Sequence, residues 1–207
     1  MARPSIAIVV AYFGASPFWL PAFFRSCREN PDVQWLLYTD FEVAGSVPPN
    51  VTITHLDVPE LASRASDVLG TRIVIRRLYK VCDLKPVYGL IFADALRPFD
   101  FWAYSDIDIV WGDIRRFVTD QMLEASDIVS SRYRKLAGPL TLFRNTPQTN
   151  RTFELIPNVT EAMASSAHLY LDEIELTRPL RDHLAKDPPP SWPRVSWQKE
   201  MTMSAAY

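Results

Sequence analysis

The sequence predicts an α/β domain with a mostly parallel central sheet that is flanked by helices. Residues 6–13 form a continuous apolar run rich in β-branched residues, which is typical of a strand buried on both faces. A stretch with apolar residues at helical spacing follows and ends at Asn30-Pro31. Two more apolar runs cover 33–38 and 51–56. This order of strand, helix, strand, loop and strand favours a parallel sheet covered by helices.

The later part of the chain continues this alternation. Further helices are predicted over residues 61–69, 83–95, 113–123 and 147–156. Short strands are predicted over residues 101–104, 128–130 and 140–143. Asp83 suits the N-cap of its helix, because an aspartate can accept hydrogen bonds from first-turn amides. Beyond Asp182 the pattern fades, and the prolines at 188–190 predict an irregular, proline-rich tail over 184–207.

The composition is that of an ordinary globular protein. The chain has 207 residues, of which 48% are hydrophobic and 22% are charged, so we expect a single domain over 1–207. The net charge of -2 and the scattered basic residues argue against a nucleic-acid partner. No apolar run reaches membrane-spanning length, and no signal-peptide pattern is present, so we expect a cytoplasmic protein without a transmembrane segment. Cys27 and Cys82 each lie in an apolar stretch, which favours free thiols.

Two acidic residues form the strongest local pattern. Asp106 and Asp108 follow the strand predicted at 101–104, and residues two apart in an extended backbone point to the same face. Their carboxylates would then converge on one cation, and hard oxygen ligands select Mg²⁺ or Mn²⁺. Such an ion could neutralise charge on a departing nucleoside diphosphate. The pattern alone is equally compatible with a solvated turn ahead of a helix capped by Asp113.

Longer motifs accompany this acidic pair. They cover residues 79–89, 100–108 and 112–113, with shorter motifs at 12–14, 26–31, 38–40, 140–145 and 172–173. Together, over residues 6–175, they resemble a family of bacterial and viral glycosyltransferase-like proteins with a GT-A-like fold, related to sugar transferases of polysaccharide biosynthesis. The resemblance implies a Rossmann-like nucleotide-diphospho-sugar transferase fold. It also implies a metal-dependent enzyme, similar to hexosyltransferases, that moves a sugar from a nucleotide-diphosphate sugar to a glycan or other hydroxyl acceptor.

The same resemblance implies roles for the matching positions. The donor-binding residues would be Ala11, Tyr12, Phe13, Gly14, Thr39, Asp40, Lys80, Asp83, Lys85 and Asp106. Asp106 and Asp108 would hold Mn²⁺ or Mg²⁺, and a lysine would contact the diphosphate. Asp172 or Glu173 would lie on the acceptor side, as a catalytic base or a sugar-binding acid.

Simpler structural roles stay open for several of these residues. Asp83 is favoured as a helix cap over a catalytic group, and Asp40 could make a turn at the start of a loop. Asp172 and Glu173 are equally compatible with the solvated face of an acidic helix. His168 is expected at the surface rather than as a ligand.

Chains with these motifs usually continue past this length, and GT-A enzymes often take a third metal ligand, commonly a histidine, from that later part. The domain is therefore expected to be C-terminally truncated, with its third ligand unidentified. Two alternatives remain. One is a catalytically incomplete domain that binds nucleotide or glycan. The other, ranked lower, is a phosphohydrolase with Asp106 as nucleophile, because that chemistry places the acidic pair near the start of its domain.

Overall fold

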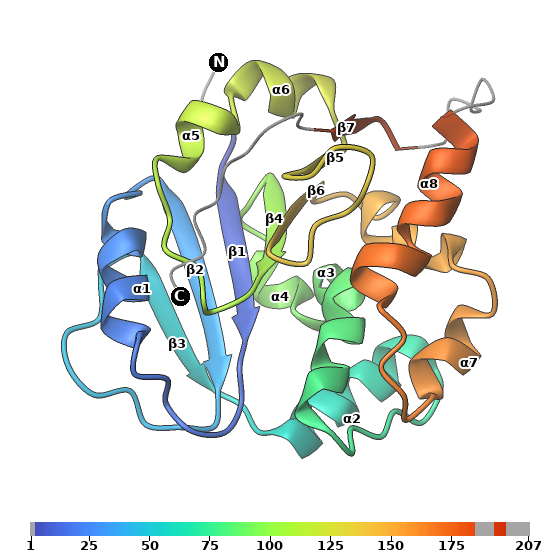
Figure 1. Ribbon diagram of the computed structural model, residues 1–207, viewed down its shortest axis with the longest axis horizontal. Coiled ribbons are helices and arrows are strands. Elements are labelled where there is room, and N and C mark those ends of the chain that lie inside the picture. The colour runs from blue at the N-terminus through green and yellow to red at the C-terminus, as the bar shows by residue number, and fades with distance from the viewer. Residues whose placement is uncertain (1–2, 185–192, 198–207) are drawn as a thin grey trace.

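A computed structural model describes residues 3–184 and 193–197, which form a seven-stranded sheet with helices packed against it (Figure 1). The strands are β1 (Ile6–Ala11), β2 (Val33–Thr39), β3 (Val51–His55), β4 (Phe101–Ser105), β5 (Ile128–Ser130), β6 (Leu140–Arg144) and β7 (Val195–Trp197). Their order in the sheet is β3-β2-β1-β4-β6-β5-β7. Strands β1 to β4 pair in parallel, as do β5 and β7, whereas β6 runs antiparallel to both β4 and β5. The predicted α/β class with a mostly parallel sheet is confirmed.

Most helices in the described residues are short, and the longest is α2 with 12 residues. The α-helices are α1 (Leu20–Arg28), α2 (Val58–Leu69), α3 (Tyr88–Ile91), α4 (Ala93–Leu96), α5 (Ile114–Phe117), α6 (Asp120–Ala125), α7 (Val159–Ala164) and α8 (Thr177–Leu184). Two 3₁₀ segments, η1 (Leu78–Val87) and η2 (Thr149–Leu155), and one π-helical turn, η3 (Leu171–Glu175), complete the set.

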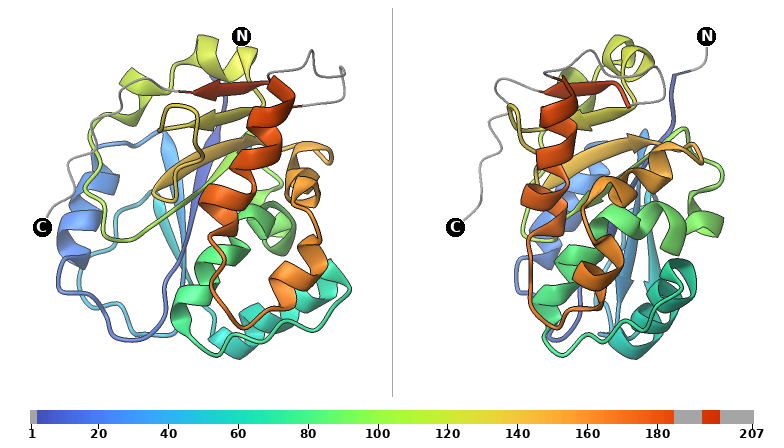
Figure 2. Two further views of the ribbon diagram at one scale, coloured as in Figure 1. Left: turned by 45° about the vertical axis from the view of Figure 1, so that its right-hand side comes forward. Right: turned by 90° about the vertical axis from the view of Figure 1, so that its right-hand side faces the viewer.

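Two hydrophobic cores cover the two faces of the sheet. Along β1, Ile6 and Ile8 point to the face covered by α1, α5 and α6, whereas Ala7 and Val9 point to the other face. That second face carries α2, η1, α3, α4 and the later helices, and η3 and α8 lie on the same side as η1 (Figure 2). A strand buried on both sides has to be apolar at consecutive positions, which is why β1 reads as an unbroken apolar run.

The helix predicted over 83–95 is wrong. The chain instead forms η1, followed by the separate one-turn helices α3 and α4. The helical segment begins five residues before Asp83, so Pro86 is the ninth residue of η1, where an α-helix would need an amide hydrogen bond that proline cannot donate. Asp83 caps no helix: its side chain is completely buried in an ion pair with Lys80.

Two other helix predictions need similar corrections. The segment 113–123 is divided into α5 and α6 at Val118, because Thr119 caps a new helix by accepting a hydrogen bond from the Met122 amide at 3.3 Å. The segment 147–156 is the 3₁₀ helix η2 rather than an α-helix.

The predicted irregular tail is also corrected in part. Residues 195–197 form β7, which adds to the sheet in parallel beside β5. Asp127, just before β5, holds the entry to β7 by accepting hydrogen bonds from the main-chain amide and the guanidinium of Arg194. The remaining tail residues, 185–192 and 198–207, lie outside the described residues.

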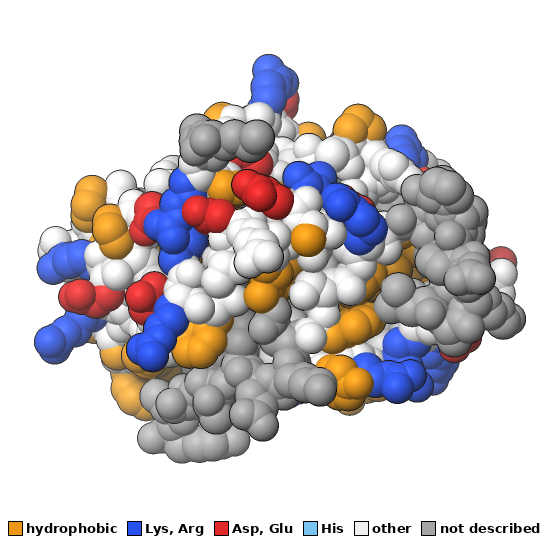
Figure 3. All heavy atoms as spheres, turned by 90° about the horizontal axis from the view of Figure 1, so that it is seen from above, with side chains coloured by type: hydrophobic (Ala, Val, Ile, Leu, Met, Phe, Trp, Pro, Cys, Tyr) orange, Lys and Arg blue, Asp and Glu red, His pale blue; other side chains and the backbone are white. Residues whose placement is uncertain are grey.

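The surface carries charges of both signs (Figure 3), and both cysteines are free thiols. Seen from above, Lys and Arg side chains are interspersed with Asp and Glu (Figure 3). Cys27 and Cys82 are both free, as predicted. Within the described ranges, none of the helices combines the length and apolar character needed to span a bilayer.

The close packing of α3 against the sheet depends on Gly89. A Cβ at Gly89 would lie 2.7 Å from the Trp102 ring. That ring cannot retreat easily, because it stacks on Phe143 at 4.5 Å and donates a hydrogen bond to Asn150. We therefore expect Gly89→Ala to lower the free energy of unfolding by about 1–3 kcal/mol through overpacking, measured by urea denaturation.

Gly112→Ala is the matched control, because a Cβ there meets no atom within 4 Å. It should change the free energy of unfolding by less than about 0.5 kcal/mol. If the two substitutions lowered the free energy of unfolding equally, the contact with Trp102 would not be what excludes a side chain at Gly89.

Candidate functional site

A cavity of about 520 Å³ opens at the carboxyl ends of β1 and β4. Its lining comes from the end of β1 (11–13), the end of β4 (105–108), residues of η1, Gly138 and the segment 168–173. The carboxyl ends of parallel strands are where α/β sheets commonly bind ligands. The volume falls in the range that small-molecule and cofactor sites occupy.

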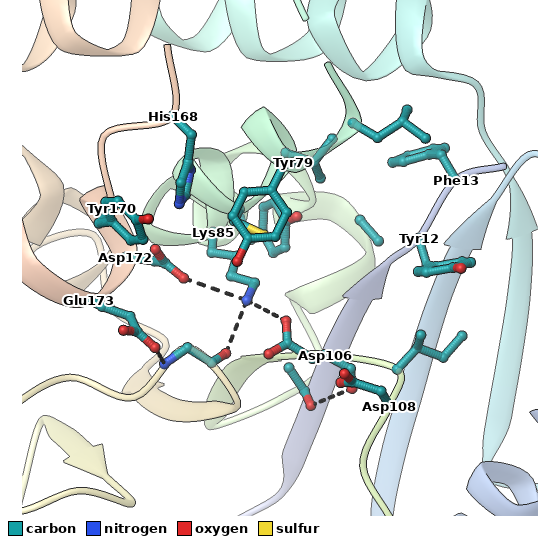
Figure 4. A pocket seen from close by; sticks show the side chains of 18 of the residues that line it. Tyr12, Phe13, Tyr79, Lys85, Asp106, Asp108, His168, Tyr170, Asp172 and Glu173 are labelled. Atoms are coloured by element: carbon teal, nitrogen blue, oxygen red, sulfur yellow. Dashed lines mark hydrogen bonds and ion pairs between the residues drawn. The ribbon is translucent and has the colours of Figure 1, made fainter. Parts of the chain in front are cut away.

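Lys85 lies at the centre of this cavity (Figure 4). Its ammonium donates hydrogen bonds to Asp106 Oδ1 at 2.6 Å and to the Gly138 carbonyl at 3.1 Å, and it lies 3.5 Å from Asp172 Oδ2. Burial alone would lower the pKa of Lys85, but the carboxylates of Asp106 and Asp172 outweigh burial and raise that pKa above its ordinary value. The lysine is therefore a permanent positive charge inside the cavity.

Asp106 and Asp108 both line the cavity, on either side of the buried Ile107. The backbone leaves the strand after Ser105 and bends, so the pair does not continue the extended strand as expected. Burial raises the pKa of Asp106, an effect that Lys85 opposes only in part. Asp108 is exposed at the cavity edge.

The contacts of Asp106 and Asp108 determine whether this pair suits a divalent metal ion. In the described part of the chain, no three or more His, Cys, Asp or Glu side chains form a common metal site. Lys85 occupies Asp106 Oδ1, whereas no described residue engages the Asp108 carboxylate. Two carboxylates fit a hard ion such as Mg²⁺, which retains several waters and takes phosphate oxygens as its other ligands. The residues present therefore fit a metal that binds together with a diphosphate.

Asp172 and Glu173 come from η3 and do not form a solvated face. Asp172 is 3% exposed, and burial raises its pKa to about 6 although Lys85 opposes this rise. Glu173 accepts hydrogen bonds from Lys135 Nζ at 2.9 Å and from the Gly138 amide at 3.0 Å. Burial raises the pKa of Glu173, but these two hydrogen bonds, together with the positive charges of Lys135 and Arg132, outweigh burial and lower the pKa. The two neighbouring acids therefore have pKa values shifted in opposite directions, Asp172 up and Glu173 down.

The structure brings together many, not all, of the sequence-predicted site residues. Those that line the cavity are Ala11, Tyr12, Phe13, Lys85, Asp106, Asp108, Asp172 and Glu173. Those outside its lining are Gly14, Thr39, Asp40, Lys80 and Asp83. Asp40 instead accepts a hydrogen bond from the Gly14 amide at 2.7 Å, so it holds the loop after β1 against the end of β2.

Sequence reasoning missed the aromatic side of the cavity. His168, expected at the surface, lines the cavity and packs between the rings of Tyr79 and Tyr170, at 4.6 and 4.3 Å between ring centroids. Cys82 also lines it, and burial raises the pKa of this thiol to about 11, so it stays protonated at neutral pH. No periodicity marks these residues, because separate segments carry them to the same wall.

Solved structures with a similar α/β fold include GT-A glycosyltransferases. Mouse xyloside xylosyltransferase 1 in its apo form matches with a TM-score of 0.51 and 9% identity, over 94% of this chain and 85% of that chain. Two other matches are the galactosyltransferase LgtC (TM-score 0.42, 11% identity, 84% of this chain and 70% of that chain) and GlyE of Streptococcus pneumoniae TIGR4 (TM-score 0.45, 11% identity, 94% and 45%).

The family itself is shown by the sequence. A family profile matches residues 8–193, and the chain belongs to this family, DUF6625, which is described as a family of unknown function. No functionally curated protein matches the sequence.

The raised pKa of Asp172 gives a pH dependence with a definite sign. Because the folded-state pKa of about 6 lies above the ordinary 3.8, the native protein favours the protonated carboxyl. The contribution of Asp172 to the free energy of unfolding is therefore greatest below pH 3.8 and falls by about 3 kcal/mol at most as the pH rises through 6. Carbon-13 NMR titration of the Asp172 carboxyl should show the midpoint near pH 6.

Lys85→Met should move this midpoint upward, because it removes the cation that favours the ionised carboxylate. The control Lys135→Met removes a cation that contacts Glu173 instead, and should leave the Asp172 midpoint near pH 6. A midpoint that does not respond to Lys85→Met would contradict the contact described above.

Proposed function

We propose that this protein is a metal-dependent glycosyltransferase that moves a sugar from a nucleotide-diphosphate sugar to a glycan or other hydroxyl acceptor. The observation that carries the proposal is the charge arrangement in the cavity. The Lys85 ammonium and two carboxylates, Asp106 and Asp108, gather at the carboxyl ends of β1 and β4 in a GT-A fold. A diphosphate needs cations, and this cavity offers one directly and a carboxylate pair suited to a second.

The donor would lie in the cavity beyond the carboxyl ends of β1 and β4. Residues 11–13 leave β1 at its carboxyl end and would form the wall for the nucleotide, with the Tyr12 ring supported edge-on by Phe41 at 6.0 Å between ring centroids. Asp106 and Asp108 would hold Mn²⁺ or Mg²⁺, which neutralises negative charge on the diphosphate. Lys85, which lies beside Asp106, would contact the diphosphate or the transferred sugar. Thr39 and Asp40 would act indirectly, through the loop that Asp40 holds.

The acceptor side would be formed by η3. A general base works best when its pKa lies near the working pH, and the Asp172 pKa of about 6 fits this requirement better than the lowered pKa of Glu173. In the transfer step, the acceptor oxygen bonds to the anomeric carbon, the bond from that carbon to the diphosphate oxygen breaks, and Asp172 takes the hydroxyl proton. Glu173, held by Lys135 and Gly138, would stay ionised and orient sugar hydroxyls.

Calorimetric titration of UDP and GDP tests the donor site, with Mn²⁺ and then with EDTA. We expect one nucleotide to bind only with the metal, and Asp108→Ala to weaken that binding tenfold or more, because it removes a ligand that no described residue engages. The control is Asp94→Ala, since the Asp94 side chain is 95% exposed and pairs only with Arg97 among the described residues.

Absence of binding under every metal condition would contradict the proposed donor site. Metal-dependent binding without sugar transfer or donor hydrolysis would favour a binding domain without turnover. Hydrolysis of an aryl phosphate that depends on Asp106 would favour the phosphohydrolase instead.

A further inference from the structure

A second charged pair lies next to the cavity but outside its lining. Lys80 Nζ lies 2.9 Å from Asp83 Oδ2, and the two side chains are 1% and 0% exposed. Burying two charges costs much free energy unless further hydrogen bonds satisfy them. Lys80 meets part of this need by donating to the Ala162 carbonyl at the end of α7, at 3.1 Å.

The Asp83 carboxylate holds the segment that leads to Asp172. Its Oδ2 accepts a hydrogen bond from the Leu169 amide at 2.8 Å, and its Oδ1 accepts one from the Leu171 amide at 3.0 Å. His168 Nδ1 also lies 3.1 Å from Oδ1, close enough for an ion pair when the imidazole is protonated. One carboxylate therefore fixes both neighbours of Tyr170.

This segment has an unfavourable backbone conformation. Tyr170 has φ 56°, in the left-handed region that residues with a Cβ rarely adopt. It leads directly into η3, a π-helical turn in which the Tyr170 carbonyl accepts a hydrogen bond from the Glu175 amide at 3.3 Å and the Leu171 carbonyl accepts one from the Leu176 amide at 3.2 Å. Such conformations persist only where surrounding contacts hold them, and π turns are frequent at functional sites. The two hydrogen bonds to Asp83 flank the strained residue.

We propose that Asp83, neutralised by Lys80, is a positioning residue that fixes residues 168–171 and thereby sets Asp172 against Lys85. Asp83 and Lys85 lie two residues apart on η1, so one short helix holds the backbone before Asp172 and faces its side chain at 3.5 Å. If the π turn lost its extra residue and became an α-helical turn, Asp172 would rotate roughly 100° about the helix axis. The catalytic consequence rests on the function proposed above, whereas the structural part stands without it.

Asp83→Asn tests this positioning role. Asparagine keeps the shape but replaces one carboxylate oxygen with an NH₂ donor, and because the Leu169 and Leu171 amides contact different oxygens of Asp83, one of them loses its acceptor. We expect hydrogen exchange at the Leu169 and Leu171 amides, measured by NMR, to accelerate tenfold or more, and the Asp172 titration midpoint to move away from about 6. UDP or GDP binding with Mn²⁺ should stay within twofold of the wild type, while kcat for sugar transfer falls tenfold or more with little change in KM for the donor.

The matched control is Asp57→Asn, because the Asp57 carboxylate also accepts a main-chain hydrogen bond, from Glu60, but lies at the start of α2 outside the cavity lining. It should leave exchange at Leu169 and Leu171 unchanged. If Asp83→Asn does not fold because Lys80 is left unpaired, Lys80→Met/Asp83→Asn removes that charge and keeps the same test.

Unchanged exchange at both amides together with an unchanged Asp172 midpoint would overturn the positioning role. Faster exchange with a shifted midpoint supports it even if the wild type transfers no sugar, so failure of the proposed function is recognised separately.

Discussion

The Lys85 ammonium joins parts of the chain that are far apart in sequence. Through contacts of 2.6, 3.1 and 3.5 Å it connects η1 to the end of β4, to the turn at Gly138 and to η3. Without this cation, the half-buried carboxylate of Asp106 and the buried carboxylate of Asp172 would lose the positive charge that favours their ionised forms, and burial would favour the neutral form of each. The lysine therefore makes it possible for the acids to remain close together near neutral pH.

The antiparallel direction of β6 explains why the Gly138 carbonyl can meet Lys85. Strand β4 runs parallel to β1 but antiparallel to β6, and Ser105 at the end of β4 pairs with Leu140 at the start of β6. The turn at Gly138 is therefore delivered to the same edge of the sheet as the carboxyl ends of β1 and β4. A fully parallel sheet would have placed that turn at the opposite edge. A Cβ at Gly138 would lie 2.7 Å from Glu173 Oε1, so a side chain there would displace the Glu173 carboxylate from its hydrogen bond with the Gly138 amide.

The sequence could predict the features that depend on residues close together in the chain. The buried strands β1 and β2 are visible as apolar runs, and the acidic pair at 106 and 108 follows such a strand directly. By contrast, the burial of Asp172 depends on η1 and on Lys85, which lie more than eighty residues earlier, and no periodicity announces a π turn. The helix expected over 83–95 failed for a similar reason. Its expected N-cap, Asp83, is instead buried and accepts hydrogen bonds from the Leu169 and Leu171 amides, which lie more than eighty residues later in the chain.

The short strand β7 has a consequence for how the protein is made. It pairs with β5 across more than sixty residues of intervening chain, and Asp127 accepts hydrogen bonds from Arg194 and Arg144 together. Strands β1 to β4 pair with one another, so these pairs can form while the ribosome is still elongating the chain. Strand β5 has an unpaired edge until residues 195–197 have been translated, so during synthesis β5, like the outer strand β3, presents an edge that is open to association with other nascent chains.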